Sequence, residues 1–226
     1  AAINTPDAVL TRRMSKTFFA GEDSIADYTV NYRKDGQQIR SFSVNFYGTG
    51  NWRATDQANV TSETPLSISM SFRRFNASTE QQITDNIASL GSAAVDLKMP
   101  DPSSTKTPKD ETIIGKRTSI THFTGDDAIA DYTENFRTGT NTLRSTSVNF
   151  YEHQNELPDQ DLDNDGVKGE QGMFLVRAKD ADPDDRLAQS VSFRADQATG
   201  ALMTPAELAA INTPDAVLTR RMSKTF

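Results

Sequence analysis

The first 18 residues of this chain are repeated, without a single change, by its last 18. Residues 1–18 read AAINTPDAVLTRRMSKTF, and residues 209–226 read the same. An exact match of that length does not arise by chance, and a single folded domain has no use for it. The match predicts a tandem array with a period of about 208 residues, in which the C-terminal segment begins the next copy.

A second, more divergent repeat lies inside the first. The segment of about 35 residues that begins at Arg13 aligns without a gap with the one that begins at Arg117, with about 20 identities and an offset of 104. The long period therefore divides into two modules, each within the usual size range of a domain. We expect module A over residues 1–104, module B over residues 105–208, and the start of the next module A over residues 209–226.

The composition excludes several classes of protein. The chain has no cysteine, which rules out a disulfide scaffold. Its net charge of −7 and its pI of about 4.9 argue against binding to nucleic acid or to an anionic membrane surface. No apolar run approaches the ~20 residues that cross a bilayer, so we expect no membrane span. Acidic arrays of this kind suit a secreted protein, in an extracellular or cell-surface setting.

Alternating apolar and polar residues predict short antiparallel strands in both modules. Asp35-Gly36 offers a hairpin turn between two of them. Glu134 stands where module A has Val30, and we expect it at an edge or rim. The fold class expected is mainly β, with tandem antiparallel β-sandwich modules that are Ig-like in architecture; a small barrel is the alternative. The predicted strands cover residues 25–32, 39–47 and 66–72 in module A, and 130–136, 143–151, 173–178 and 188–193 in module B.

Short helical segments are expected at the junctions between modules. Residues 78–90 place Ile83, Ile87 and Leu90 on one face and are followed by Gly91, a common helix end. Residues 204–207, Thr-Pro-Ala-Glu, form a capping box with proline at the first helical position. The linker is predicted over residues 99–110, which are rich in Pro, Ser, Thr and Lys.

The strongest chemical signal is an acidic loop in an insertion of about 20 residues, near 153–172, that module A lacks. Alternate aspartates followed by Gly166 let a tight loop direct several carboxylate oxygens at one hard cation. The segment resembles the DxDxDG calcium loops of many extracellular repeat proteins, although Glu170 comes two residues earlier than the last ligand of an EF-hand loop. The alternative is a solvated acidic loop. The predicted calcium ligands are Asp159, Asp161, Asp163, Asp165 and Glu170.

Other acidic residues offer weaker candidates for a cation site. Four downstream aspartates could complete the acidic loop or make a second site: Asp180, Asp182, Asp184 and Asp185. Both modules also carry Gly-acid-Asp-x-Ile-Ala-Asp-Tyr, at residues 21–28 and 125–132. A turn before a strand, with aspartates accepting backbone hydrogen bonds, explains this motif better than a second cation site does.

We expect no catalytic activity. The two histidines are His122 and His153, and His122 aligns with Phe18, which indicates packing rather than proton transfer. The sequence has no thiol, phosphate-binding loop, nucleophile elbow or zinc-helix motif. Trp52, the single tryptophan, is expected in a core; a platform for a glycan is the other interpretation.

The leading functional expectation is a structural tandem-repeat protein that forms an extracellular filament, stalk or long surface fibre. Calcium would stiffen alternate modules, and the partners would be other copies of the same repeat, arranged head to tail. One alternative is a cell-surface adhesin whose modules act as spacers or bind glycans. Another is a polymer of short subunits that exchange a terminal strand.

Overall fold

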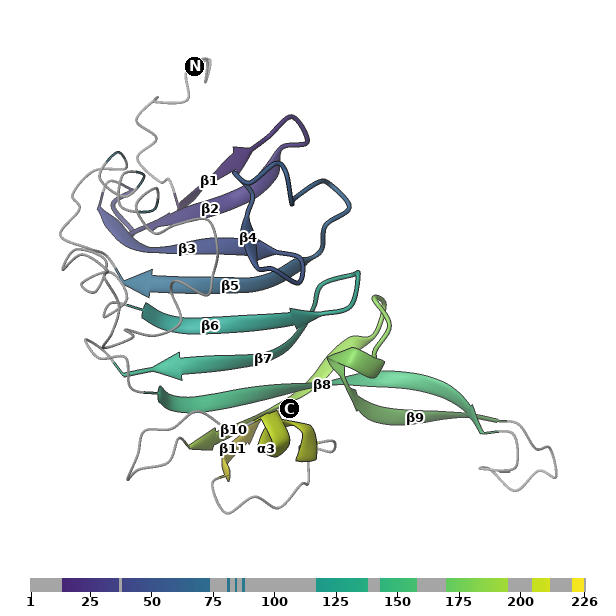
Figure 1. Ribbon diagram of the computed structural model, residues 1–226. Coiled ribbons are helices and arrows are strands. Elements are labelled where there is room, and N and C mark those ends of the chain that lie inside the picture. The colour runs from purple at the N-terminus through teal and green to yellow at the C-terminus, as the bar shows by residue number, and fades with distance from the viewer. Residues whose placement is uncertain are drawn as a thin grey trace, which may run out of the picture. The chain divides into compact units, whose positions relative to one another are not determined.

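The computed structural model describes residues 14–36, 38–73, 81, 84, 87, 117–137, 143–157, 170–194, 205–211 and 221–225. These residues are mainly β, with few helices (Figure 1). No helix among them is long and apolar enough to cross a membrane. The strands are β1 (Ser15–Ala20), β2 (Ile25–Tyr32), β3 (Ile39–Tyr47), β4 (Trp52–Arg53), β5 (Leu66–Arg73), β6 (Arg117–Thr124), β7 (Ile129–Phe136), β8 (Leu143–Leu157), β9 (Glu170–Arg177), β10 (Arg186–Arg194) and β11 (Arg221–Thr225). The helical elements are the 3₁₀ helix η2 (Ala178–Asp180), the α-helix α3 (Pro205–Ala210) and the isolated positions 81, 84 and 87.

The strands form one antiparallel sheet in the order β1-β2-β3-β5-β6-β7-β8-β10-β11, with β4 beside β3 and β9 beside β8. The prediction of a mainly β, antiparallel fold is confirmed. The expected Ig-like sandwiches are not seen, because every described strand pairs within this one sheet and none of them forms a second layer. The predicted strands are found in place, and β8 continues beyond residue 151 to pair with β9 in a ribbon.

The contacts divide the chain into two units, with the division inside β6 between Ile120 and Thr121. The predicted module limits at residues 104 and 208 stay predictions. The predicted linker at 99–110 and the predicted limit at 104 lie outside the described residues.

In unit 1, the strand alternation buries one face of β2, β3 and β5. Val30, Val44 and Phe46 are fully buried, as expected from the period of two. Phe42 lies opposite Phe72 in the pairing of β3 with β5, and their rings stack with centroids 5.0 Å apart. The other face of these strands carries serine, threonine and asparagine, and stays polar.

A helical segment, rather than a second sheet, covers the apolar face of unit 1. Positions 81, 84 and 87 are helical, within the helix predicted over residues 78–90. Ile87 is 1% exposed, and the Thr84 hydroxyl lies 2.7 Å from the Tyr28 hydroxyl of β2. Because residues three apart lie on the same side of a helix, both face the sheet.

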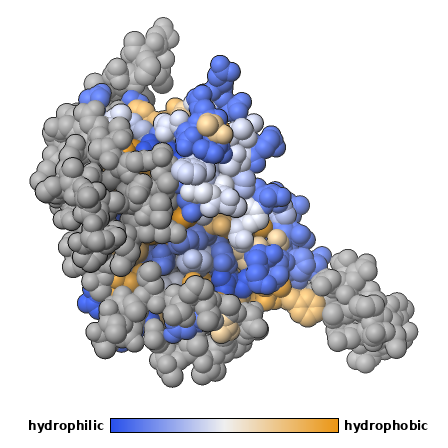
Figure 2. All heavy atoms as spheres, viewed as in Figure 1, coloured by the Kyte–Doolittle hydropathy of each residue, from blue (hydrophilic) through white to orange (hydrophobic). Residues whose placement is uncertain are grey.

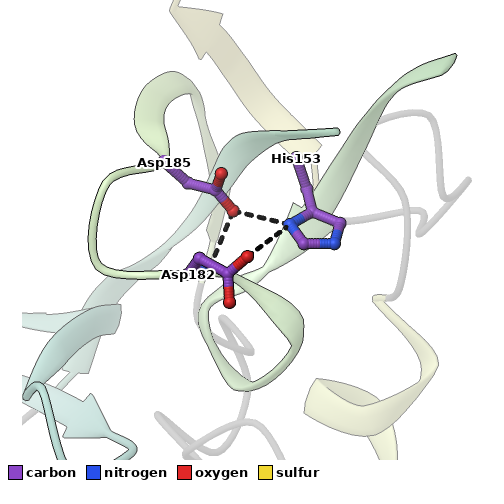
Figure 3. Close-up of side chains that lie close together, drawn as sticks. All are labelled: His153, Asp182 and Asp185. Atoms are coloured by element: carbon purple, nitrogen blue, oxygen red, sulfur yellow. Dashed lines mark hydrogen bonds and ion pairs between the residues drawn. The ribbon is translucent and has the colours of Figure 1, made fainter. Parts of the chain in front are cut away.

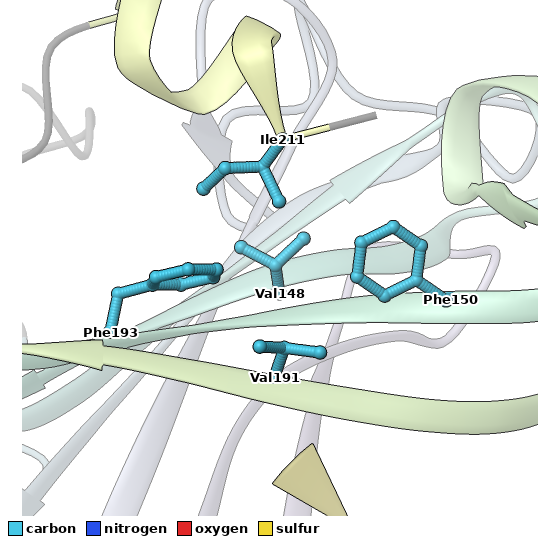
Figure 4. Close-up of a cluster of buried hydrophobic side chains, with 5 residues drawn as sticks. All are labelled: Val148, Phe150, Val191, Phe193 and Ile211. Carbon is cyan, nitrogen blue, oxygen red and sulfur yellow. The ribbon is translucent and has the colours of Figure 1, made fainter. Parts of the chain in front are cut away.

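Unit 2 has the same cover. Ile211, just after α3, packs onto Val148 and Phe150 of β8 and Val191 and Phe193 of β10, all nearly inaccessible to solvent (Figure 4). Leu208 of α3 packs against this cluster. The helix predicted from the capping box is therefore present, and it replaces the second layer of a sandwich.

The turns before β2 and β7 are alike. Gly21 and Gly125 have φ of 73° and 75°, and Ser24 and Ala128 both have φ of 53°. The left-handed region is natural for glycine but is strained by about 1 kcal/mol or more for a residue with a Cβ. Two modules that differ at many positions keep the same turn, which supports the interpretation of this motif as a turn before a strand.

An arginine–aspartate ion pair, buried in unit 1 and partly buried in unit 2, joins the sheet to the helical cover. In unit 1, Arg53 donates to both carboxylate oxygens of Asp27, with Nε–Oδ1 at 2.7 Å, and its Nη1 donates to the carbonyl of Ile87 at 3.3 Å. In unit 2, Arg177 binds both oxygens of Asp131 at 2.7 and 2.6 Å, and its Nη1 donates to the carbonyl of Ile211 at 2.9 Å. Each arginine thus connects the sheet to its helical cover.

Substitution of Asp27 by asparagine should strongly destabilise unit 1. The Arg53 and Asp27 side chains are each 6% exposed, so loss of the carboxylate leaves a buried guanidinium without its counter-charge. Breaking such a pair costs about 3–5 kcal/mol. Unfolding in urea can be followed by the fluorescence of Trp52, the only tryptophan, which adjoins Arg53.

The exposed Glu63→Gln is the matched control, with an expected change within about 0.5 kcal/mol. An Asp27→Asn chain as stable as this control would show that the ion pair does not hold the unit together.

Candidate assembly edges and metal ligands

The last described strand, β11, belongs by sequence to the next repeat, and it lies on β10. Its residues, 221–225, repeat residues 13–17 exactly. The two strands pair antiparallel, with Ser190 opposite Thr225, Val191 opposite Lys224 and Ser192 opposite Ser223. The β10 edge therefore accepts a strand whose sequence is that of the N-terminal strand region.

Module A ends in the same way. The strand that follows β5 in the sheet is β6, which corresponds to β1 at the offset of 104. Within unit 1, Thr118 Oγ1 of β6 donates to the carbonyl of Ser71 in β5 at 3.1 Å. β5 and β10 both close with Ser-Phe-Arg, at residues 71–73 and 192–194. The first strand of the following module thus lies next to the last long strand of each module.

β1 leaves one edge of the sheet open in the part of the chain that the structure describes. There it pairs only with β2. Two large apolar side chains beside this edge are exposed, Met14 by 82% and Phe19 by 62%. An open strand edge is a template for pairing with another strand.

The predicted calcium ligands are not tested by the described residues. Asp159, Asp161, Asp163 and Asp165 lie outside them. Glu170 begins β9, where its backbone pairs with Leu157, and its side chain is not described. The acidic loop therefore connects the two strands of the β8–β9 ribbon, and calcium stays a prediction.

Two of the downstream aspartates meet His153 (Figure 3). Its Nδ1 lies 2.8 Å from Oδ2 of Asp185 and 3.6 Å from Oδ2 of Asp182, and all three ligand atoms lie within 4.8 Å of one another. The Asp185 carboxylate also accepts the backbone N–H of Asp182 at 2.8 Å. Asp180 pairs instead with Lys179. Sequence reasoning missed the role of His153, because only the extension of β8 brings it beside the turn before β10.

This trio could accept a borderline divalent cation. Zinc bonds of about 2.0–2.1 Å in tetrahedral geometry place ligand atoms roughly 3.3 Å apart, between the two distances from His153 Nδ1 to the carboxylate oxygens. An imidazole ligand favours zinc or cobalt over calcium, which prefers oxygen alone. Two carboxylates would balance the charge of the ion. Among the described residues, no other group of three such side chains converges in this way.

The aspartates of the Gly-acid-Asp motif have other partners. Asp27 and Asp131 hold the two buried arginines, and Asp23 accepts the backbone N–H of Ser62 at 3.2 Å. Sequence reasoning identified the turn but missed the arginine partners, which lie 26 and 46 residues away along the chain.

Trp52 packs in unit 1 rather than standing free as a platform for a sugar. It lies against the buried cluster of Tyr47, Ala54 and Val60. A Cβ added to Gly50 would come within 2.2 Å of the indole nitrogen, so only glycine fits beneath the ring. The interpretation of Trp52 as a packing residue fits these contacts.

His122 occupies the packing position of Phe18. Phe18 stacks on Tyr28 with centroids 4.4 Å apart, and His122 stacks on Tyr132 at 4.2 Å. Its Nε2 also lies 3.1 Å from Glu134, the residue that replaces Val30. Burial, reinforced by the carboxylate of Glu134, raises the pKa of Tyr132 to about 12. A hydrogen-bonded pair thus replaces two apolar side chains, and Glu134 is largely buried, not at an open rim.

A second exposed apolar surface lies at the β8–β9 ribbon. Met173, Phe174 and Leu187 are all exposed, and they line a shallow groove with Leu175. Figure 2 shows this surface in orange beside the ribbon.

Comparison of the chain with protein-family models, curated proteins and solved structures finds no match. Function must therefore be inferred from the residues of this chain.

Zinc should stabilise the fold through His153. A free ion at about 100 times its dissociation constant adds about 2.7 kcal/mol to the free energy of unfolding, and the melting temperature should rise with zinc concentration. The His153→Gln variant should lose most of this rise.

Asp163→Ala, a change in the acidic loop, is the control and should keep the rise. An equal response of the wild-type chain and the His153→Gln variant would remove this trio as a metal site.

Proposed function

We propose that this chain is part of a structural tandem-repeat protein whose modules join edge to edge into a filament, stalk or long surface fibre. The observation that carries the proposal is the pairing of β11 with β10. A strand that belongs by sequence to the next repeat extends the sheet of this one. The open edge of β1 is the matching surface at the other end of the strand order.

These two edges favour a linear assembly. The β10 edge and the β1 edge are different surfaces, so a contact between them is heterologous and leaves both ends of a pair available for further copies. In such arrays the stability is roughly the sum of the module stabilities and the terms for each junction. The backbone hydrogen bonds of a paired strand would join module to module without any need for a large side-chain interface.

A covalent array is the preferred form of this assembly. β11 lies on the β10 edge of its own chain, so a continuous chain needs no exchange of strands. The alternative, in which short subunits exchange their terminal strand, uses the same two edges. The intact mass of the native protein under denaturing conditions distinguishes them, because a covalent array has a mass many times the 24.9 kDa of this chain.

Calcium is proposed as a stiffener of alternate modules. The acidic loop follows β8 and precedes β9, in an insertion that module A lacks. Crowded carboxylates repel one another unless a cation lies among them, and a bound ion reduces the freedom of the loop. Each repeat of the array would carry one such loop.

Removal of β11 should make the chain associate head to tail. A chain that ends at Ile211 keeps α3 but exposes the β10 edge, which β1 of another chain can then occupy. Sedimentation velocity should show oligomers that grow with concentration, whereas the whole chain, whose β10 edge is covered, should associate less.

A peptide of residues 209–226 in excess should dissolve these oligomers, and the same peptide with Ser223→Pro should not, since proline cannot donate to a strand pair. A shortened chain that keeps the circular dichroism of the whole chain but stays monomeric would contradict the edge-to-edge proposal.

Calcium should raise the melting temperature, by an amount that grows with the free ion concentration. The Asp163→Ala variant should lose this response, because a central ligand is missing from the loop. His153→Gln is the matched control and should keep it. Full retention of the response by Asp163→Ala would exclude the acidic loop as the calcium site.

A further inference from the structure

Three arginines line a groove on the polar face of unit 1. Arg33 follows β2, Arg40 is the second residue of β3, and Arg73 ends β5; Ser41 and Thr118 complete the lining. All three arginine side chains are exposed. No ion pair joins any of them to another described residue, and the nearby Asp35 accepts the backbone N–H of Gln38 at 3.0 Å. These like charges, in a protein of net charge −7, thus have no ion-pair partner within the part of the chain that the structure describes.

Module B keeps all three. Arg137, Arg144 and Arg194 occupy the corresponding positions and are also exposed. The five hairpin residues between the first two arginines, 34–38, differ at every position from residues 138–142. The sequence between the two arginines has therefore diverged completely, while the arginines on both sides of it are unchanged. Solubility alone would not require guanidinium groups at these three positions.

The arginines end rows of hydroxyl and amide side chains that cross the strands. In unit 1 one row is Asn31, Ser41 and Arg73, and the next is Thr29, Ser43 and Ser71. In unit 2 the same rows read Asn135, Ser145 and Arg194, then Thr133, Ser147 and Ser192. Cross-strand bonds such as Asn31 to Ser41, at 3.4 Å, keep these side chains in place. Each unit thus carries rows of hydroxyl and amide side chains, half-buried except for the buried Ser145, with exposed guanidinium groups at one end.

The side chains of this face indicate the class of ligand that it can bind. A guanidinium group matches a carboxylate or a sulfate with two parallel hydrogen bonds. Hydroxyl and amide groups both donate and accept hydrogen bonds, as the hydroxyls of a sugar require. The acidic character of the whole chain opposes a dense polyanion such as nucleic acid, whereas a polysaccharide with spaced charges needs only local positive groups.

We infer that the polar face of each module binds an acidic polysaccharide, with Arg33, Arg40 and Arg73, or their module B counterparts, holding its carboxylate or sulfate groups. The sheet places the hydroxyl rows beside the arginines, so charge and sugar hydroxyls are recognised by the same surface. This inference does not depend on assembly into a fibre. In an array, the repetition of the face would add avidity along a long polysaccharide.

The test uses the whole chain and four probes: polygalacturonate, dextran sulfate, neutral dextran and duplex DNA, by affinity electrophoresis. The chain should be retarded by one or both acidic polysaccharides and not by neutral dextran. Retardation by polygalacturonate identifies carboxylate as the recognised group, and retardation by dextran sulfate identifies sulfate. No retardation by either would overturn the inference, and stronger binding to DNA through the same arginines would replace a saccharide with nucleic acid.

Substitution of the arginines distinguishes a specific binding site from non-specific electrostatic attraction. Arg40→Gln with Arg144→Gln removes one arginine from each module and should weaken binding about tenfold or more, since a charge-assisted hydrogen bond is lost at each site. The control, Lys179→Gln with Arg186→Gln, removes the same charge from exposed positions away from the groove and should leave the affinity nearly unchanged. Equal losses in both variants would show that only net charge matters, and the site would be rejected.

A second pair of variants tests geometry. Arg40→Lys with Arg144→Lys keeps the charge but not the planar fork, so binding should stay clearly weaker than that of the wild-type chain. Full recovery would mean a site for charge alone and would count against recognition of a specific oxyanion group. Circular dichroism of each variant checks that the fold is intact.

Discussion

An arginine–aspartate ion pair holds the helical cover of each unit on its sheet. Arg53 lies in the short strand β4, yet its guanidinium reaches Asp27 on β2 and the carbonyl of Ile87 in the helical segment. Breaking such a pair leaves a buried charge without its partner and lowers the free energy of unfolding by several kcal/mol. The pair therefore favours one placement of the helical cover on the sheet. Arg177 repeats the arrangement with Asp131 and Ile211. The cover lies on the apolar face in both units, and the other face carries hydroxyl and amide side chains.

The single covered face explains why the sheet can continue from module to module. In a β-sandwich, the core lies between two sheets, and the edge strands are short. Here each module has one layer of strands, and its core is closed by a helical segment above that layer. In the proposed assembly, growth would occur at the first and last strands, where backbone groups remain to be paired.

Much of the fold could be predicted from the sequence, and the failures share a cause. Strand alternation predicted which residues of β2 and β3 are buried, and the capping box predicted α3, because both signals are local. Alternation does not tell whether a strand pairs within one sheet or crosses to another, so sandwiches were expected wrongly. The partners of Asp27 and Asp131 are distant in the chain, and so are those of His153. The calcium loop stays a prediction, because its aspartates lie outside the described residues.

Comparison of the two modules separates what every module needs from what only one has. Both keep the buried ion pair, the turn before the second strand, the hydroxyl rows and the three exposed arginines. Only module B has the acidic loop, His153 and the pair of His122 with Glu134. Features shared by diverged copies belong to the fold or to a surface repeated along the array. In the proposed array, the acidic loop and His153 would recur only in alternate modules, so a bound ion would change the stiffness at intervals of one full repeat rather than at every junction.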